Sequence, residues 1–411
     1  MVPPMVSLNS RSSEKWALAT VLSAAFALFT PMMLHTMVGE TDFPFHLEFA
    51  RKMWSLGEPA TPHFLYQALV IAVALALHGF DASRAALPGG FENAGFVIGV
   101  CAYLLLAFIL YRTFLTHLRP GEGWKNAWVA ACLALALMLV APVNLLSIPS
   151  RKLYLGYIGM NIFHSSTMRL VVPLSVWLFF EVLRSLRGED GASGAWRRTA
   201  VLALATALNV LAKPNFAICL LPALGLAMAW RLGAKKRIDA LPLLLGVFGM
   251  AVAILLWQYQ FAFERQALGT PMKIVWAPFQ VHGLYSSWLL PKFLLSIAFP
   301  LYVSLAYARC AREDFRLSFA WLIFAFGAFY EYFLAQAEPS SPNFGFGDFF
   351  WSGQISLYLL FIASVLFLIN LPPSERGRRW WPGWGVFGLH LCSGLVWYYV
   401  QLTSRPVSLW W

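Results

Sequence analysis

Residues 16–46 read WALATVLSAAFALFTPMMLHTMVGETDFPFH, an apolar run that ends in a short acidic segment. The run 16–38 carries no Asp, Glu, Lys or Arg and, as a helix, is long enough to cross a hydrocarbon layer. It exceeds a signal-peptide core and lacks a small-x-small cleavage pattern before the acidic segment. We therefore expect a retained membrane-spanning helix at 16–38.

Composition extends this expectation to the whole chain. Hydrophobic residues make up 59% of the 411 residues and charged residues only 12%, whereas a soluble domain carries about 25% charge. The prediction is an all-α polytopic bundle of about 11–12 spans, forming a single transmembrane domain over 1–411 without a large soluble domain. The expected apolar segments are 16–38, 63–80, 94–115, 124–147, 168–186, 198–212, 214–230, 240–261, 292–311, 317–335, 351–371 and 384–402.

The net charge of +11 falls mainly on loop ends, which indicates membrane topology and contact with anionic lipids and argues against a nucleic-acid partner. Four connections are strongly basic and are predicted to be cytoplasmic. Their basic residues are Arg184, Arg187, Arg197 and Arg198; Arg231, Lys235, Lys236 and Arg237; Arg309, Arg312 and Arg316; and Arg376, Arg378 and Arg379.

The opposite, outer side then holds the connections 39–62, 148–168, 262–290 and 336–350. The connection 116–124 is also basic, and two full crossings cannot join it to an outer 39–62. One segment, 63–80 or its neighbour, is therefore expected to re-enter the membrane, to lie in its interface, or not to be a span.

The acidic segment that follows the first span carries Asp42 and, four residues later, His46. If 45–56 is helical, the two side chains lie near one helix face. A carboxylate beside a histidine can take a proton from an acceptor hydroxyl. The structural alternative is that Asp42 caps the helix.

Basic side chains on the predicted outer side are candidates for binding phosphate. Lys213 lies between two apolar runs, and Pro214 disfavours helix at that position; the alternative is a snorkelling lysine. His164 and Arg169 close the polar connection 148–168, which also carries Lys152, and Ser165, Ser166 and Thr167 can cap the next helix.

The two later outer connections carry candidate sugar- or acceptor-binding groups: His282, Glu338, Asn343 and Asp348. Their structural alternatives are an aromatic loop at the headgroup level, a solvated turn, and a helix cap at Asp348. Glu331, inside an apolar run, needs a partner.

The chain resembles the GT-C superfamily of integral-membrane glycosyltransferases, which carry an acidic motif in the first outer loop; Glu40-Thr41-Asp42 is similar to that motif in position and spacing. It also resembles bacterial membrane proteins of exopolysaccharide and cell-envelope loci. The matching pieces are Asp42-x-x-x-His46, Tyr154-Leu-Gly with Asn161-Ile-Phe-His164, Lys213-Pro214, Ile274-Val-Trp-Ala-Pro278, and Asn343-Phe near Trp351. Asn343 and Asp348 replace the His-Gly-Asn-Phe run of that group.

The resemblance implies a polyprenyl-phosphate-linked sugar donor, a lipid or glycan acceptor, and inverting transfer with Asp42 as general base. Lys213, His164 and Arg169 would hold the donor phosphate. Glu40 would position the acceptor or share a divalent cation, Mg²⁺ or Mn²⁺, with Asp42; no cofactor is certain. The implied location is the bacterial inner membrane, with the site facing the periplasm. The alternatives are a polysaccharide polymerase or ligase that uses lipid-linked oligosaccharide, and a lipid or glycan transporter.

Overall fold

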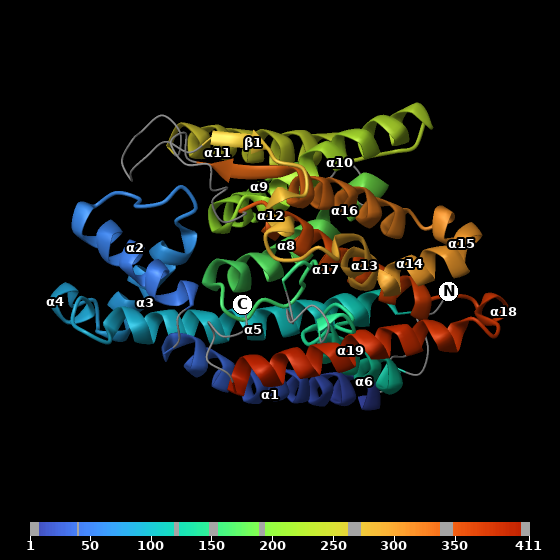
Figure 1. Cartoon of the computed structure of the whole chain (residues 1–411), viewed down its shortest axis with the longest axis horizontal. Coiled ribbons are helices and arrows are strands. Elements are labelled where there is room, and N and C mark those ends of the chain that lie inside the picture. Colours follow the sequence, from blue (N-terminus) through green and yellow to red (C-terminus); the bar gives the residue numbers. More distant parts are fainter. Residues whose placement is uncertain are drawn as a thin grey trace.

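The protein is a bundle of helices, seen in a computed structural model (Figure 1). The structure describes residues 8–38, 41–118, 123–147, 155–188, 194–261, 273–337 and 348–403. The first helices are α1 (Leu8–Val38), α2 (Asp42–Leu56), α3 (Leu65–Leu77), α4 (Ala82–Ala85), α5 (Gly90–His117), α6 (Gly123–Leu137), α8 (Ser166–Arg187) and α9 (Ala195–Ala212). The later ones are α10 (Asn215–Gly233), the π-helix η2 (Pro242–Gly249), α11 (Met250–Tyr259), α12 (Gln280–Gly283), α13 (Leu289–Ser296), α14 (Ala298–Ala306), α15 (Ala308–Glu313), α16 (Phe315–Phe333), α17 (Phe350–Ile369), α18 (Pro373–Arg376) and α19 (Trp380–Thr403).

Within the described residues, six helices are long and apolar enough to cross a membrane. They are Ser12–Val38, Gly90–His117, Ser166–Arg187, Asn215–Gly233, Pro242–Tyr259 and Phe350–Ile369. The pair α13 and α14, bent by 66°, would supply a seventh as one broken span. The multi-pass helical character expected from composition is confirmed, whereas fewer helices than the expected 11–12 pass this test.

The difference lies in segments that are apolar and helical but short or interrupted. The helix in segment 63–80, α3, has 13 residues and rises only about 20 Å, against a hydrocarbon layer of about 30 Å. Segment 124–147 stops being helical at Leu137, and segment 292–311 divides into α13, α14 and α15. The short α3 agrees with the expectation that one segment near 63–80 does not cross fully.

The long helices define two ends of the bundle. In Figure 1, α1, α5, α10 and α19 run along the long axis, with α2 near one end and α15 and α18 near the other. The charge of Arg187, near the end of α8, acts on Arg231 of α10 and on Arg316 of α16. These three basic connections therefore meet at one end, away from α2.

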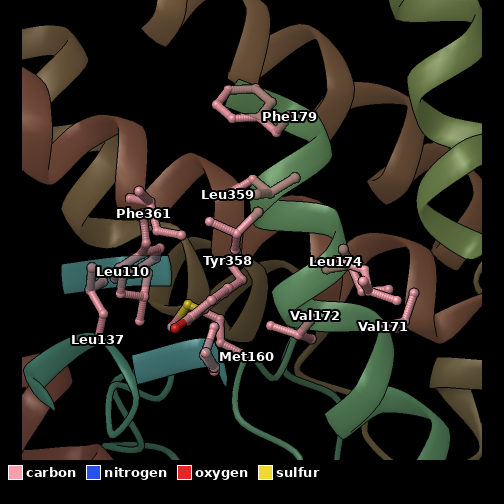
Figure 2. Close-up of a cluster of buried hydrophobic side chains, with 14 of the residues drawn as sticks. Leu110, Leu137, Met160, Val171, Val172, Leu174, Phe179, Tyr358, Leu359 and Phe361 are labelled. Carbon is pink, nitrogen blue, oxygen red and sulfur yellow. The ribbon is translucent and has the colours of Figure 1, made fainter. Parts of the chain in front are cut away.

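Helix α17 forms the centre of the core. It is apolar all round and buried from Ser352 to Leu368, as expected of a helix enclosed by other helices. Figure 2 shows Tyr358 and Phe361 of α17 with Leu174 and Phe179 of α8 among the buried side chains. This packing holds α17 between α8, α10, α14 and α16.

Two short strands join connections that were both predicted to lie on the outer side. Strand β1 (Lys273–Trp276) pairs antiparallel with β2 (Leu334–Ala337), with Lys273 opposite Ala337. The strand ribbon is an addition to the expected all-α fold. It ties residues 273–276 directly to the end of α16.

Helix α19 packs closely against the non-helical segment that follows α6. The backbone N–H of Ala141 donates to the carbonyl of His390 at 3.1 Å, and the ring nitrogen Nδ1 of His390 donates to the Ala141 carbonyl at 2.7 Å. A Cβ at Gly394 would lie 1.6 Å from the carbonyl oxygen of Leu139. The segment and helix can approach this closely only because residue 394 is glycine.

Gly394→Ala is expected to lower the free energy of unfolding by about 1–3 kcal/mol, the usual cost of overpacking a tight contact. Gly388→Ala, in the same helix, meets no atom within 4 Å and should be neutral or stabilising by up to about 1 kcal/mol through helix propensity. Thermal unfolding of the detergent-solubilised protein measures both. Equal midpoints for the two variants would contradict the close approach.

Candidate functional site

Asp42 lies at the corner between α1 and α2 but is not the N-cap of α2. The Thr41 hydroxyl donates to the Thr36 carbonyl at 2.7 Å and accepts from the backbone N–H of Phe43 at 3.2 Å, so Thr41 is the N-cap of α2. Asp42 is the first helical residue and is partly exposed. Within the described residues its carboxylate has no hydrogen-bonded partner, and the capping alternative for Asp42 is corrected in favour of Thr41.

A glycine in α5 lets the first turn of α2 pack closely. A Cβ at Gly95 would lie 2.9 Å from the ring of Phe43 and 3.0 Å from the hydroxyl of Tyr66. Phe43 is 1% exposed. This contact anchors the residue next to Asp42 against a long helix of the bundle.

One turn along α2, His46 is buried against α3. The amide nitrogen of Gln67 lies 3.0 Å from Nδ1 of His46. Since an amide nitrogen only donates, Nδ1 accepts and the imidazole proton is placed on Nε2. Burial, then the charge of Lys213, lowers the pKa of His46 to about 4, so the ring is neutral at pH 7.

The start of α8 carries His164 and Arg169. Arg169 donates to the hydroxyls of Ser166 at 3.0 Å and Thr36 at 3.3 Å, and it also contacts the sulfur of Met33. These bonds fix the buried guanidinium between α1 and α8. Burial lowers the pKa of His164 to about 4, so Arg169 brings a positive charge and His164 a neutral imidazole.

The predicted break at Lys213-Pro214 separates α9 from α10. Lys213 is 6% exposed; its Nζ lies 3.4 Å from the Thr167 hydroxyl and 4.6 Å from the centroid of the Trp351 ring. A snorkelling lysine would extend its ammonium group into water, whereas this one is directed into the protein. Burial lowers the pKa of Lys213, and the carboxylates of Asp348 and Asp42 oppose that shift.

The side chain of Asn215, just after the break, fixes the start of α17. It donates to the backbone carbonyl of Asp348 at 2.7 Å and to the hydroxyl of Ser352 at 2.9 Å. Asp348 itself is exposed. The first turns of α10 and α17 are thereby joined beside Lys213.

The charges of these groups act on one another, which places the groups in a common region. The charge of Asp42 acts on Lys213, on His46 and on His164. The charge of Arg169 acts on both imidazoles. Acid and cation therefore converge at one end of the bundle. We refer to Asp42, His46, His164, Arg169 and Lys213 as the candidate site.

His63 also belongs to this region, although sequence reasoning passed over it. Burial and the charge of Lys213, followed by that of His46, hold its pKa well below the usual range. The residue precedes the apolar run of α3, where no motif distinguishes it. Its only available signal was that it is the first residue of segment 63–80, which, with its neighbour, was a candidate for an incomplete crossing.

His282 lies in a separate buried cluster. Its Nε2 is 3.0 Å from a carboxylate oxygen of Glu331, which supplies the partner that Glu331 needed. Burial, then the charge of Lys292, lowers the pKa of His282 to about 3. The ring also contacts Tyr332 at 4.5 Å between centroids, so His282 lies among core side chains, and the charge that acts on it is that of Lys292.

Four other predicted site residues, Glu40, Lys152, Glu338 and Asn343, lie outside the described residues. In the part of the chain that is described, no three His, Cys, Asp or Glu side chains gather in a way that could hold a metal ion. A cation shared by Glu40 and Asp42 therefore stays a prediction.

The fold and this arrangement define a multi-pass helical membrane protein with a polar, charge-bearing site at one end of the bundle. Comparisons with protein-family models, with curated proteins and with solved structures found no significant match.

Proposed function

We propose that the chain is an integral-membrane glycosyltransferase that uses a polyprenyl-phosphate-linked sugar as donor. The observation that carries the proposal is that a carboxylate without a hydrogen-bonded partner in the described chain, Asp42, and two buried cations, Lys213 and Arg169, act electrostatically on the same two imidazoles, those of His46 and His164. Transfer from a phosphate-linked sugar needs these two functions: a base for the acceptor and positive charge for the leaving phosphate.

In the proposed reaction the Asp42 carboxylate takes the proton of an acceptor hydroxyl. The acceptor oxygen then forms a bond to the anomeric carbon of the sugar, and the bond from that carbon to the phosphate oxygen breaks. The phosphate leaves with the electron pair, and a single displacement inverts the configuration. Lys213 and Arg169 stabilise the charge that develops on the leaving phosphate.

The two neutral imidazoles supply hydrogen bonds in this scheme. With Nδ1 accepting from Gln67, His46 has its Nε2–H available to donate. Donation to an acceptor oxygen or to a phosphate oxygen orients the ligand without adding charge. Asp348, joined to the start of α10 through its backbone carbonyl, is proposed to bind sugar hydroxyls.

The distribution of basic residues indicates which side of the membrane the candidate site faces. Three basic connections meet at the end of the bundle away from α2, and the positive-inside rule assigns such an end to the cytoplasm. The candidate site would then face the opposite, periplasmic side of a bacterial inner membrane. A lipid-borne donor is available there, whereas soluble nucleotide sugars are cytoplasmic.

The full chain, purified in detergent, is to be incubated with a polyprenyl-phosphate hexose and a mixture of lipid and glycan acceptors. The expected result is acceptor-dependent release of polyprenyl phosphate together with a glycosylated product, measured by mass spectrometry. Turnover of a lipid-linked oligosaccharide alone, with long products on a gel, would replace the proposal with a polymerase or ligase. Movement of lipid or glycan across proteoliposomes without covalent change would replace it with a transporter.

A further inference from the structure

The end of the bundle opposite the candidate site brings together arginines from three helices. Arg187 lies at the end of α8, Arg231 near the end of α10, and Arg316 in the first turn of α16. Arg231 is 9% and Arg316 7% exposed, and the charge of Arg187 acts on both. Two guanidinium groups are thus largely removed from water beside a third positive charge.

The chain supplies few acceptors to the two buried groups. Arg231 donates to the backbone carbonyl of Arg237 at 3.3 Å, and Arg316 donates to the carboxylate of Asp314 at 3.0 Å. The Nε atoms of both are buried and meet no acceptor in the described residues. A guanidinium carries five N–H donors, and a buried cation is costly unless it is paired. Arg231 and Arg316 therefore each keep a buried Nε–H without an acceptor in the described residues, and Arg231 has no carboxylate partner there.

The surface beside these arginines is aromatic and apolar. The guanidinium of Arg231 lies 4.9 Å from the centroid of the Phe315 ring, and the ring of Trp230 stacks on Phe315 at 5.9 Å. Trp230 is 58% and Leu232 57% exposed. Exposed tryptophan at the end of a membrane helix is typical of the level where lipid headgroups meet acyl chains.

We propose that Arg187, Arg231 and Arg316 bind the phosphate of an anionic phospholipid. Guanidinium forks match phosphate oxygens in a bidentate manner, and a phosphate supplies acceptors to the buried Nε–H groups of Arg231 and Arg316 and adds a negative charge beside three arginines. Trp230 and Leu232 offer the adjacent acyl chains an apolar contact. A free phosphate ion shares the headgroup chemistry but gains nothing from that contact. The site is independent of the proposed transferase activity.

The test uses the full chain, delipidated in neutral detergent, and native mass spectrometry of retained phosphatidylglycerol against phosphatidylcholine. The wild type is expected to retain phosphatidylglycerol preferentially. Arg231→Gln with Arg316→Gln should weaken this retention by about tenfold or more. Lys235→Gln with Arg312→Gln is the matched control, because it removes the same charge from exposed positions at the same end and should retain the lipid.

Because the glutamine pair can impair folding, Arg231→Lys with Arg316→Lys is a second test. It keeps both charges but loses the planar forks, so retention should fall between wild type and the glutamine pair. Displacement of phosphatidylglycerol by millimolar inorganic phosphate would support the anion site and assign it to a free ion. Equal retention of the two lipids by wild type, or equal loss in the control pair, would overturn the proposal.

Discussion

Asp42→Asn is expected to lower the turnover of sugar transfer by about 10²–10⁴-fold, the usual contribution of a general base. Asparagine keeps the size of the side chain but cannot accept the hydroxyl proton. Thr41, and not Asp42, caps α2, so the helix and its contact with α5 should survive the change. The measurement is kcat for product formation, with donor affinity determined in parallel.

The matched control is Glu48→Gln, which makes the same acid-to-amide change at an exposed position of the same helix. Within the described chain, Glu48 forms one ion pair, a long one of 3.9 Å with Arg51. It should leave turnover within about twofold, because an exposed ion pair contributes little. Donor affinity in Asp42→Asn should stay near that of wild type, since the phosphate contacts Lys213 and Arg169. Wild-type turnover in Asp42→Asn would remove the assigned base and, with it, the mechanism.

Much of the fold can be predicted from the positions and lengths of the apolar segments. Each of the twelve expected segments coincides with one helix or a group of helices, because a run of apolar residues must satisfy its backbone groups internally. The number of membrane crossings cannot be predicted from apolar length, because apolar residues are favoured both inside a helix bundle and on its lipid-facing surface. Helix α17 and helix α1 are both apolar, yet only α17 is enclosed on all sides.

The candidate site was predictable where a charged residue interrupts an apolar stretch. Lys213 lies between two apolar runs, and Asp42 and Arg169 stand at the ends of such runs. The basic connections on the opposite side then indicated that all three lie on the outer side. His63 was not predictable in this way, because it precedes an apolar run without a distinguishing neighbour. For His282, an aromatic, polar loop indicated a binding surface, but the ring is 3% exposed and its Nε2 contacts one carboxylate oxygen of the buried Glu331.

Lys213→Met is expected to lower kcat/KM for the lipid-linked donor by about 10²–10³-fold, a loss typical of removing one preorganised group that stabilises developing charge. Methionine preserves much of the aliphatic volume against Trp351, where the ammonium lies 4.6 Å from the ring centroid. Because burial opposes the charge of Lys213, the variant without donor should unfold at a temperature close to that of wild type. Donor-induced thermal stabilisation should disappear.

The pH dependence separates a phosphate ligand from a lysine that only packs. Since burial lowers the pKa of Lys213, its charge is lost at a lower pH than that of an ordinary lysine, and donor affinity should fall as the pH rises through the alkaline range. Lys213→Arg stays charged there, so its donor affinity should persist to higher pH, even if the larger head group weakens binding at neutral pH. Lys235→Met, at an exposed position near the opposite end of the bundle, should behave as wild type at every pH. Parallel pH profiles for wild type and Lys213→Arg would show that the ammonium does not hold the phosphate, and Lys213 would then be a packing residue between α9 and α17.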